Sequence, residues 1–142
     1  MNKLYVLFLV ILPIGVSAQS DSLFKICQPG IFTRVEAPPN IKIEKSIYED
    51  SLKQNLKRRD AFFNSGNIHL KFIVTFDGNI SEVHKISGDI EYNKEIGKSI
   101  MELSDLWKPG IQNGRAVCSY VELNIEFSKD HITTTVIPSG VH

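Results

Sequence analysis

Trp107-Lys-Pro-Gly-Ile-Gln-Asn-Gly-Arg115 is the segment of this 142-residue chain that decides the fold. Its Pro109-Gly110 pair ends a helical pattern, and its Asn113-Gly114 pair is typical of a tight turn. The residues that follow alternate between two faces, which predicts a half-buried strand over 117–127. The apolar face carries Ser119, Val121, Leu123, Ile125 and Phe127, and the more polar face carries Cys118, Tyr120, Glu122, Asn124 and Glu126.

A helix is predicted immediately before this segment. Asn93 is a suitable N-cap, because its side-chain oxygen can accept a backbone N–H of the first turn. Apolar residues then recur at helical spacing and reach the only tryptophan of the chain, so we expect Trp107 to be a core anchor rather than a ligand site. Pro109, Gly110 and Gly114 are the other structural anchors that we expect in the loop. The apolar stripe consists of Ile96, Ile100, Leu103 and Trp107.

Another helix is predicted upstream, over 44–63, and a β-hairpin follows it. Residues 68–76 alternate, and Asp77-Gly78 predicts a type I′ turn, since both central positions of that turn need positive φ. The returning arm, 79–86, does not keep a period of two, and a β-bulge would explain this. One face of the helix carries Tyr48, Leu52, Leu56 and Phe63.

Together these elements predict an α+β domain over 44–128, in helix–strand–strand–helix–strand order. Its three strands would form an antiparallel sheet with both helices on one face, because the helices are needed to close the core. Residues 19–43, which contain Pro29-Gly30 and Pro38-Pro39, are expected to form an extended lead-in. The 129–142 tail has a β-prone run at 133–137; an extra strand and a loose end are both open, and the loose end is preferred.

Residues 1–18 have the pattern of a secretory signal peptide. Lys3 precedes an apolar run, and small residues precede a cleavage point between Ala18 and Gln19. The run is thirteen residues long and contains a proline, whereas a membrane-spanning helix needs about 20 apolar residues. Cleavage is the preferred interpretation, and retention as an inner-membrane anchor is the alternative. The mature protein is therefore expected in the periplasm or outside the cell.

The charge balance argues against two classes of partner. The chain has 16 basic and 16 acidic residues, so loss of Lys3 would leave 15 against 16, a formal charge of −1. Non-specific nucleic-acid binding depends on neutralising phosphates, and docking on anionic lipid also needs positive charge. We therefore expect neither partner.

Cys27 and Cys118 are the only cysteines in the sequence. In an exported protein they could form a disulfide, but the sequence does not show whether the two positions meet. Two unpaired thiols are the default expectation, and a disulfide is the alternative. A reactive thiol is disfavoured, because neither residue lies in a CxxC pattern or beside a histidine.

No set of metal ligands or catalytic groups stands out. His69 and His84 lie on the two arms of the hairpin, but the predicted turn would pair position 71, not 69, with 84, and no carboxylate completes a ligand set. Asp77 is expected to be a turn residue, and Glu122 and Glu126 are expected to be solvated strand residues. We therefore predict no enzyme activity, no metal and no cofactor.

The chain from about 35 to 127 resembles the C-terminal domain of the TonB family. The most specific part is Leu106-Trp-Lys-Pro-Gly-Ile-Gln-Asn-Gly-Arg115. The resemblance also covers Ile68-His-Leu-Lys-Phe-Ile-Val-Thr-Phe-Asp-Gly-Asn-Ile80, the blocks at 51–56 and 87–96, and the strand end at 124–127. Two departures stand out. Arg58-Arg59 replaces a frequent Tyr-Pro, and Asn40-Ile-Lys42 replaces a frequent Gly-Gly.

The resemblance implies a periplasmic protein-binding domain. Family members contact outer-membrane receptors through a short peptide that adds as a strand beside the last strand, so that backbone hydrogen bonds supply affinity. The implied partner is an outer-membrane receptor peptide or another envelope transport protein. The expected binding edge consists of Val117, Cys118, Ser119, Tyr120, Val121, Glu122, Leu123 and Asn124.

A protein-binding module of this kind is the preferred functional interpretation. The first alternative is a short, membrane-anchored energy transducer, although complete transducers have a long Pro-rich spacer and a lead-in of about 25 residues reaches at most about 90 Å. The second is a redox or hydrolytic envelope enzyme on the same scaffold, whose mark would be a reactive Cys118.

Overall fold

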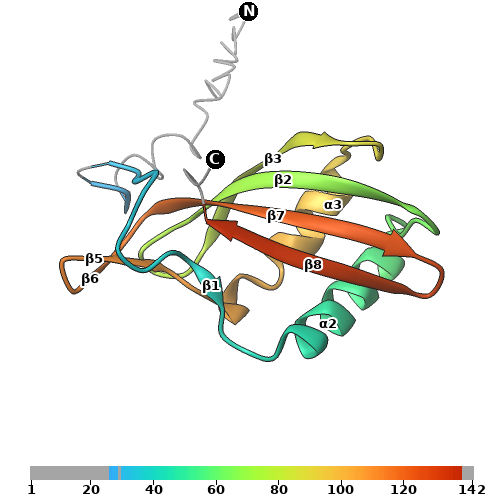
Figure 1. Ribbon diagram of the computed structural model, residues 1–142, viewed down its shortest axis with the longest axis horizontal. Helices are drawn as coiled ribbons and strands as arrows, with labels where there is room; N and C mark the ends of the chain where they lie inside the picture. The colour runs from blue at the N-terminus through green and yellow to red at the C-terminus, as the bar shows by residue number, and fades with distance from the viewer. Residues whose placement is uncertain (1–25, 29, 139–142) are drawn as a thin grey trace, which may run out of the picture.

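The computed structural model describes residues 26–28 and 30–138. Within them, one antiparallel sheet has the strand order β3-β2-β7-β8, and two helices cover one of its faces (Figure 1). The fold is therefore α+β, as predicted. The signal peptide expected at 1–18, with its cleavage point at Ala18-Gln19, lies outside the described residues. The main elements are α2 (Lys45–Arg58), β2 (Gly66–Val74), β3 (Ile80–Gly88), α3 (Lys94–Met101), β7 (Ser119–Ser128) and β8 (His131–Pro138).

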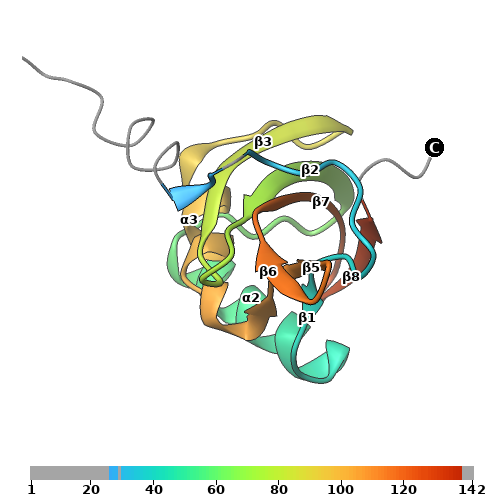
Figure 2. The ribbon, with the colours of Figure 1, turned by 90° about the vertical axis from the view of Figure 1, so that its left-hand side faces the viewer.

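Five short elements connect and border these. The segment η1 (Ser104–Leu106) is a single 3-10 turn between α3 and β4. β1 (Asn40–Ile41) pairs with β4 (Trp107–Lys108), and β5 (Gly110–Gln112) pairs with β6 (Arg115–Val117). These two small ribbons lie at one end of the main sheet (Figures 1 and 2).

The helix α2 ends in a Schellman motif. Its last residue is Arg58, five residues before the predicted end at 63. Asp60 takes up the left-handed conformation, with φ of 55°. The amide of Ala61 then donates to the carbonyl of Leu56 at 2.8 Å, and the amide of Asp60 donates to that of Lys57 at 3.1 Å, which satisfies the carbonyls of the last turn. Tyr48, Leu52 and Leu56 of the predicted stripe are fully buried, and Phe63 lies beyond the helix.

The helix α3 begins at the predicted N-cap but ends before Trp107. The Oδ1 atom of Asn93 accepts hydrogen bonds from the amides of Glu95, at 2.9 Å, and Ile96, at 3.2 Å. The helix stops at Met101, so the prediction that it reaches Trp107 is wrong: η1 intervenes, and Trp107 begins β4. The Trp107 side chain is nevertheless fully buried, which confirms its predicted role as a core anchor.

Glycine is favoured at two positions near Trp107. Gly110 is buried, and a Cβ atom there would lie 2.5 Å from the Oγ atom of Ser119 and 3.1 Å from Val35 Cγ2, so a side chain fits only if these neighbours move. Asn113 and Gly114 have φ of 52° and 74°, which confirms the tight turn predicted for this pair. Pro109 is half-buried between β4 and β5. The segment is therefore a rigid connection that leads directly into β7.

The β2–β3 hairpin forms at the predicted place with a different turn. Only Gly78 of the Asp77-Gly78 pair has positive φ, so the type I′ prediction is wrong. The amide of Gly78 donates to the carbonyl of Thr75 at 2.9 Å, and the amide of Thr75 donates to that of Asn79 at 2.8 Å, which closes a longer loop. The Asp77 carboxylate accepts hydrogen bonds from the side chains of Thr75 and Asn79, so its predicted role as a turn residue is confirmed.

The strand β3 is irregular, as its broken period predicted. One shift in the β2–β3 register follows His69 and another follows Lys71. Glu82 lies opposite the second shift and has φ of 56°. Lys71 pairs with His84, the pairing expected from the turn, so His69 and His84 are offset.

The tail forms a fourth strand, so the predictions of a three-stranded sheet and a loose end are wrong. β8 pairs with β7 along eight positions, from Val121 opposite Pro138 to Ser128 opposite His131. Its side chains alternate, and Ile132 and Thr134 are buried against the helical layer. The β-prone run at 133–137 therefore forms part of this strand, and Ile132 and Val136 extend the core beyond residue 128.

The lead-in is fastened to the sheet by a disulfide. Cys27 and Cys118 are bonded, with their Cα atoms 5.6 Å apart, so the default expectation of two free thiols is wrong and the alternative is confirmed. They pack with Ile31, Ile73 and Tyr120 in a small second core. From there the lead-in runs along the end of the sheet, past the β5–β6 hairpin, to β1 (Figure 2). Residues 26–28 and 30–43 are therefore part of the folded unit.

Candidate functional site

The strand predicted to offer a docking edge has a partner on both sides. β7 pairs with β2 from Ser119 to Phe127, and on its other side it pairs with β8 from Val121 onward. A partner strand could add there only by displacing one of these neighbours, so the predicted edge is wrong. Of the eight residues predicted to form it, Val117 ends β6, Cys118 precedes β7, and residues 119–124 lie within β7.

The first residues of β7, which β8 does not reach, are covered by the lead-in. The amide of Phe32 donates to the carbonyl of Cys118 at 2.9 Å, and the amide of Tyr120 donates to that of Phe32 at 3.0 Å. This parallel bridge continues the β8 side of β7. The disulfide lies beside it, so the lead-in holds this stretch closed.

The polar face of β7 carries one buried carboxylate. Glu122 is only 3% exposed, and its Oε1 atom lies 3.1 Å from Nε2 of His69 on β2. The expectation that it would be solvated is wrong, because its neighbours on the open face of the sheet cover it, whereas Glu126 is exposed as predicted. The ammonium of Lys71 lies 4.6 Å from the centre of the Tyr120 ring. These contacts cross-link neighbouring strands.

The described residues hold no metal-binding group. Within 26–28 and 30–138, no three or more His, Cys, Asp or Glu side chains converge as ligands. Cys118 is oxidised, so it offers no thiolate for the redox chemistry of the enzyme alternative. The Oγ atom of Ser128 lies 2.9 Å from the ring nitrogens of His131, where the two residues face each other at the β7–β8 turn.

Among the described residues, three side chains have a shifted pKa. Burial raises the pKa of Tyr48, whose hydroxyl lies in the core, and partial burial raises the pKa of Tyr92. A hydrogen bond from Arg59 lowers the pKa of Glu95. Arg59 also contacts Glu102, so this arginine joins the end of α2 to α3.

The two outer strands of the sheet differ in how well they can accept a further strand. β3 is interrupted by its two bulges and by the positive φ of Glu82. Bulges of this kind twist an edge and break its row of hydrogen-bonding groups. β8 pairs with β7 without a register shift. The regular outer edge of the described sheet is therefore that of β8.

The outward-facing backbone groups of β8 can be assigned from one contact. The carboxylate of Glu49, on α2, accepts hydrogen bonds from both the amide and the hydroxyl of Thr134. The Thr134 amide therefore points away from β7. Backbone groups alternate in direction along an antiparallel strand, so the amide and carbonyl of Val136 also point outward. Glu49 thus accepts the hydrogen of one outward amide, that of Thr134. The next outward amide along β8 is that of Val136.

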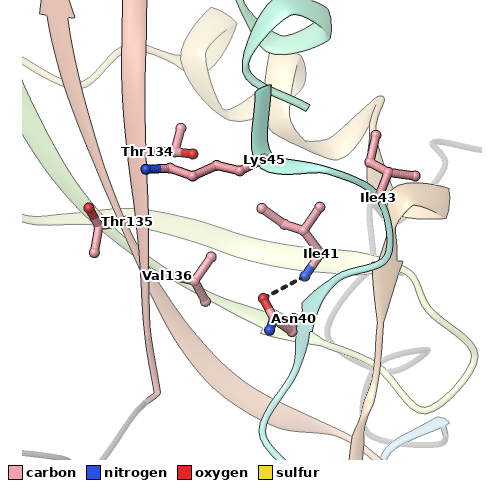
Figure 3. Close-up of a pocket in the computed structure, with 7 residues that line it drawn as sticks. All are labelled: Asn40, Ile41, Ile43, Lys45, Thr134, Thr135 and Val136. Atoms are coloured by element: carbon pink, nitrogen blue, oxygen red, sulfur yellow. Dashed lines mark hydrogen bonds between the residues drawn. The ribbon is translucent and has the colours of Figure 1, made fainter. Parts of the chain in front are cut away.

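A groove runs beside this part of β8. It has a volume of about 360 Å³ and separates β8 from β1 and the start of α2. Figure 3 shows the Lys45 side chain reaching across it toward β8, with Asn40 and Ile41 facing Val136. Lys45 is exposed and forms no ion pair with another described side chain. The lining residues are Asn40, Ile41, Ile43, Lys45, Thr134, Thr135 and Val136.

The arrangement suits recognition of an extended backbone. Its polar groups are main-chain donors and acceptors, and apolar side chains from β1 and β8 flank them. One feature of the sequence pointed to this site, namely the β-prone run at 133–137. Because the run lies near the C-terminus, a loose end was preferred to a strand. The sequence did not predict β1 on the other side of the groove, because its two residues form a strand only by pairing with β4.

Among residues 26–28 and 30–138, no helix is long and apolar enough to cross a membrane. No family model, curated protein or solved structure matches this chain.

Proposed function

We propose that this protein is an exported protein-binding module of the cell envelope that captures an extended segment of an outer-membrane receptor, or of a related transport protein, by strand addition at β8. The observation that carries the proposal is the regular outer edge of β8, where Val136 presents its amide and carbonyl to an open groove. In strand addition, main-chain hydrogen bonds supply affinity and alternate side chains supply specificity.

The resemblance to the TonB family C-terminal domain supports the class of partner. Its most specific part, 106–115, folds into the connection that places Trp107 in the core and leads into β7. The order of the long elements up to β7 also agrees with the family. The docking strand differs from the one that the resemblance implies, because β8 takes the outer position that β7 would have had.

The proposal is for a module that recognises its partner and transmits no force by itself. An anchored transducer would need the N-terminal segment to remain in the inner membrane. The N-terminal mass of the protein recovered from the envelope separates these functions: a chain that begins at Gln19 in the soluble fraction supports the module, and one that retains Lys3 in the membrane fraction supports the transducer.

The binding test uses a pair of variants at one position. Val136→Pro removes the outward amide, and an edge strand tolerates proline where the N–H faces solvent. Val136→Ala trims the same side chain but keeps the amide. Synthetic N-terminal segments of TonB-dependent receptors should bind the parent and Val136→Ala and lose at least about tenfold in affinity for Val136→Pro. Equal affinity of the folded variants would exclude β8 as the docking strand.

A further inference from the structure

The wall of the groove opposite β8 also presents main-chain groups. The amide of Lys42 donates to the carbonyl of Leu106 at 2.8 Å, toward β4. Because direction alternates along a strand, the backbone groups of Ile41 point to the other side of β1, into the groove. Figure 3 shows the Ile41 nitrogen on this side, facing Val136. The groove therefore lies between two strand edges.

The amide of Ile41 is satisfied by a local side chain. The Oδ1 atom of Asn40 accepts its hydrogen at 2.8 Å. Asn40 is exposed, so its side chain can rotate away without losing a buried contact. An incoming carbonyl could then replace the side-chain oxygen as the acceptor, at the cost of one hydrogen bond and with the gain of another.

The space between the two edges is open. Within residues 30–138, no backbone hydrogen bond joins β1 to β8. The groove has a volume of about 360 Å³. One extended segment placed there could bond to Val136 on one side and to Ile41 on the other, and so connect β8 to the β1–β4 ribbon.

Charge decides the side chain that such a segment should carry. The ammonium of Lys45 reaches across the groove (Figure 3), and Lys42, which is also exposed, lies nearby in the chain. Two carboxylates are close to Lys45 in the chain: Glu44, which is exposed, and Glu49, which is bonded to Thr134. A carboxylate on the incoming segment would therefore meet a positive charge, and a cationic side chain would meet repulsion.

We propose that the groove between β1 and β8 is a two-sided slot for one extended, acidic segment of a partner protein, with the Asn40 side chain as a latch that the segment displaces. The inference rests on the proposed function and goes beyond it, since addition to β8 alone needs nothing from β1.

The probe is a blocked peptide of sequence Thr-Val-Glu-Val-Thr-Val, and an analogue with Lys in place of Glu is its control. Binding to the mature protein is measured by calorimetry.

Val136→Pro and Ile41→Pro each remove one of the two facing amides, whereas Val136→Ala and Ile41→Val retain them. Both proline variants should bind the acidic peptide at least about tenfold more weakly than their matched controls. Asn40→Ala should bind it more tightly, because the Ile41 amide no longer has a local acceptor.

Amide hydrogen exchange on the parent protein needs no substitution and covers the case in which Ile41→Pro does not fold. The peptide should slow exchange at both Ile41 and Val136. Protection at Val136 alone would overturn the slot and leave addition to β8 intact. Absence of peptide binding would also overturn the slot, while capture of receptor segments remains a separate measure of the proposed function. The Lys analogue should bind about two- to fivefold more weakly; equal affinity would overturn the preference for an acidic segment.

Discussion

The indole nitrogen of Trp107 donates a hydrogen bond to the hydroxyl oxygen of Tyr48, and the two atoms lie 3.1 Å apart. Both side chains are fully buried, and their rings meet edge to face with centroids 5.8 Å apart. The Trp107 ring meets Phe72 of β2 in the same way, at 5.3 Å. One indole thus ties α2 and β2 to the connection that leads into β7.

Loss of either partner should destabilise the fold by a predictable amount. Trp107→Ala should lower the free energy of unfolding by about 3–5 kcal/mol, through lost burial and a cavity. Tyr48→Phe keeps the ring but leaves a buried N–H unpaired, which should cost about 1–3 kcal/mol. Urea unfolding measures both changes. Tyr120→Phe, on the other face of the sheet, is the matched control and should change stability less than Tyr48→Phe; the reverse order would show that this hydrogen bond has no such role.

Removal of the disulfide should loosen the start of β7. The bond joins residues 91 positions apart, for which a chain-entropy estimate gives about 4–5 kcal/mol of stabilisation. The double variant Cys27→Ser, Cys118→Ser should lose a comparable amount. Its Tyr120 amide, which donates to Phe32, should exchange faster with solvent, whereas amides in the β2–β7 centre should change only with global stability. Unchanged exchange at Tyr120 would mean that Phe32 stays in place without the disulfide.

The cap of α2 offers a stabilising substitution. Asp60 holds φ of 55°, a conformation that glycine adopts without a steric penalty. Asp60→Gly should therefore raise the free energy of unfolding by about 0.5–1 kcal/mol. Asp60→Ala, which also removes the charge but keeps a Cβ atom, should lower it. Thermal melting of the two variants shows whether each is more or less stable than the parent protein. A glycine variant less stable than the parent would contradict the strain argument.

Acid should weaken the contact between α2 and α3. The hydrogen bond from Arg59 holds the pKa of Glu95 below its ordinary value of 4.5. A carboxyl group with a lowered pKa in the folded state contributes stability above about pH 4.5, and this contribution is lost as the pH falls through the folded-state pKa. Glu95→Gln should therefore make the free energy of unfolding depend less on pH as the pH falls below about 4.5. The control is Glu91→Gln, which removes an exposed carboxylate outside this contact. A Glu95→Gln variant with the same slope as the parent protein would contradict the assignment.

Local patterns predicted much of this fold because they report local physics. The stripe from Tyr48 to Leu56 predicted the buried face of α2, and the N-cap at Asn93 was visible as a side chain able to accept the first amides of a helix. The broken period of 79–86 predicted the irregular β3. In each case the pattern can be recognised within one short segment, although the buried face of α2 packs against distant residues such as Trp107.

Features that depend on distant residues were missed or, like the disulfide, left open as an alternative. The β8 strand needs β7 as its neighbour, and nothing within 129–142 reveals that pairing. The disulfide joins positions 91 residues apart. The burial of Glu122 depends on the strands beside it. These errors had one functional consequence: the docking edge was assigned to β7, because the strand that covers it was expected to be a loose end.

The most direct measurement of the central claim is amide hydrogen exchange with a receptor segment bound to the mature protein. If the segment adds to β8, exchange should slow at Val136, whose amide points outward, and change little at Thr135, whose amide already faces β7. Protection confined to β3 or to the start of β7, with Val136 unaffected, would contradict strand addition at β8.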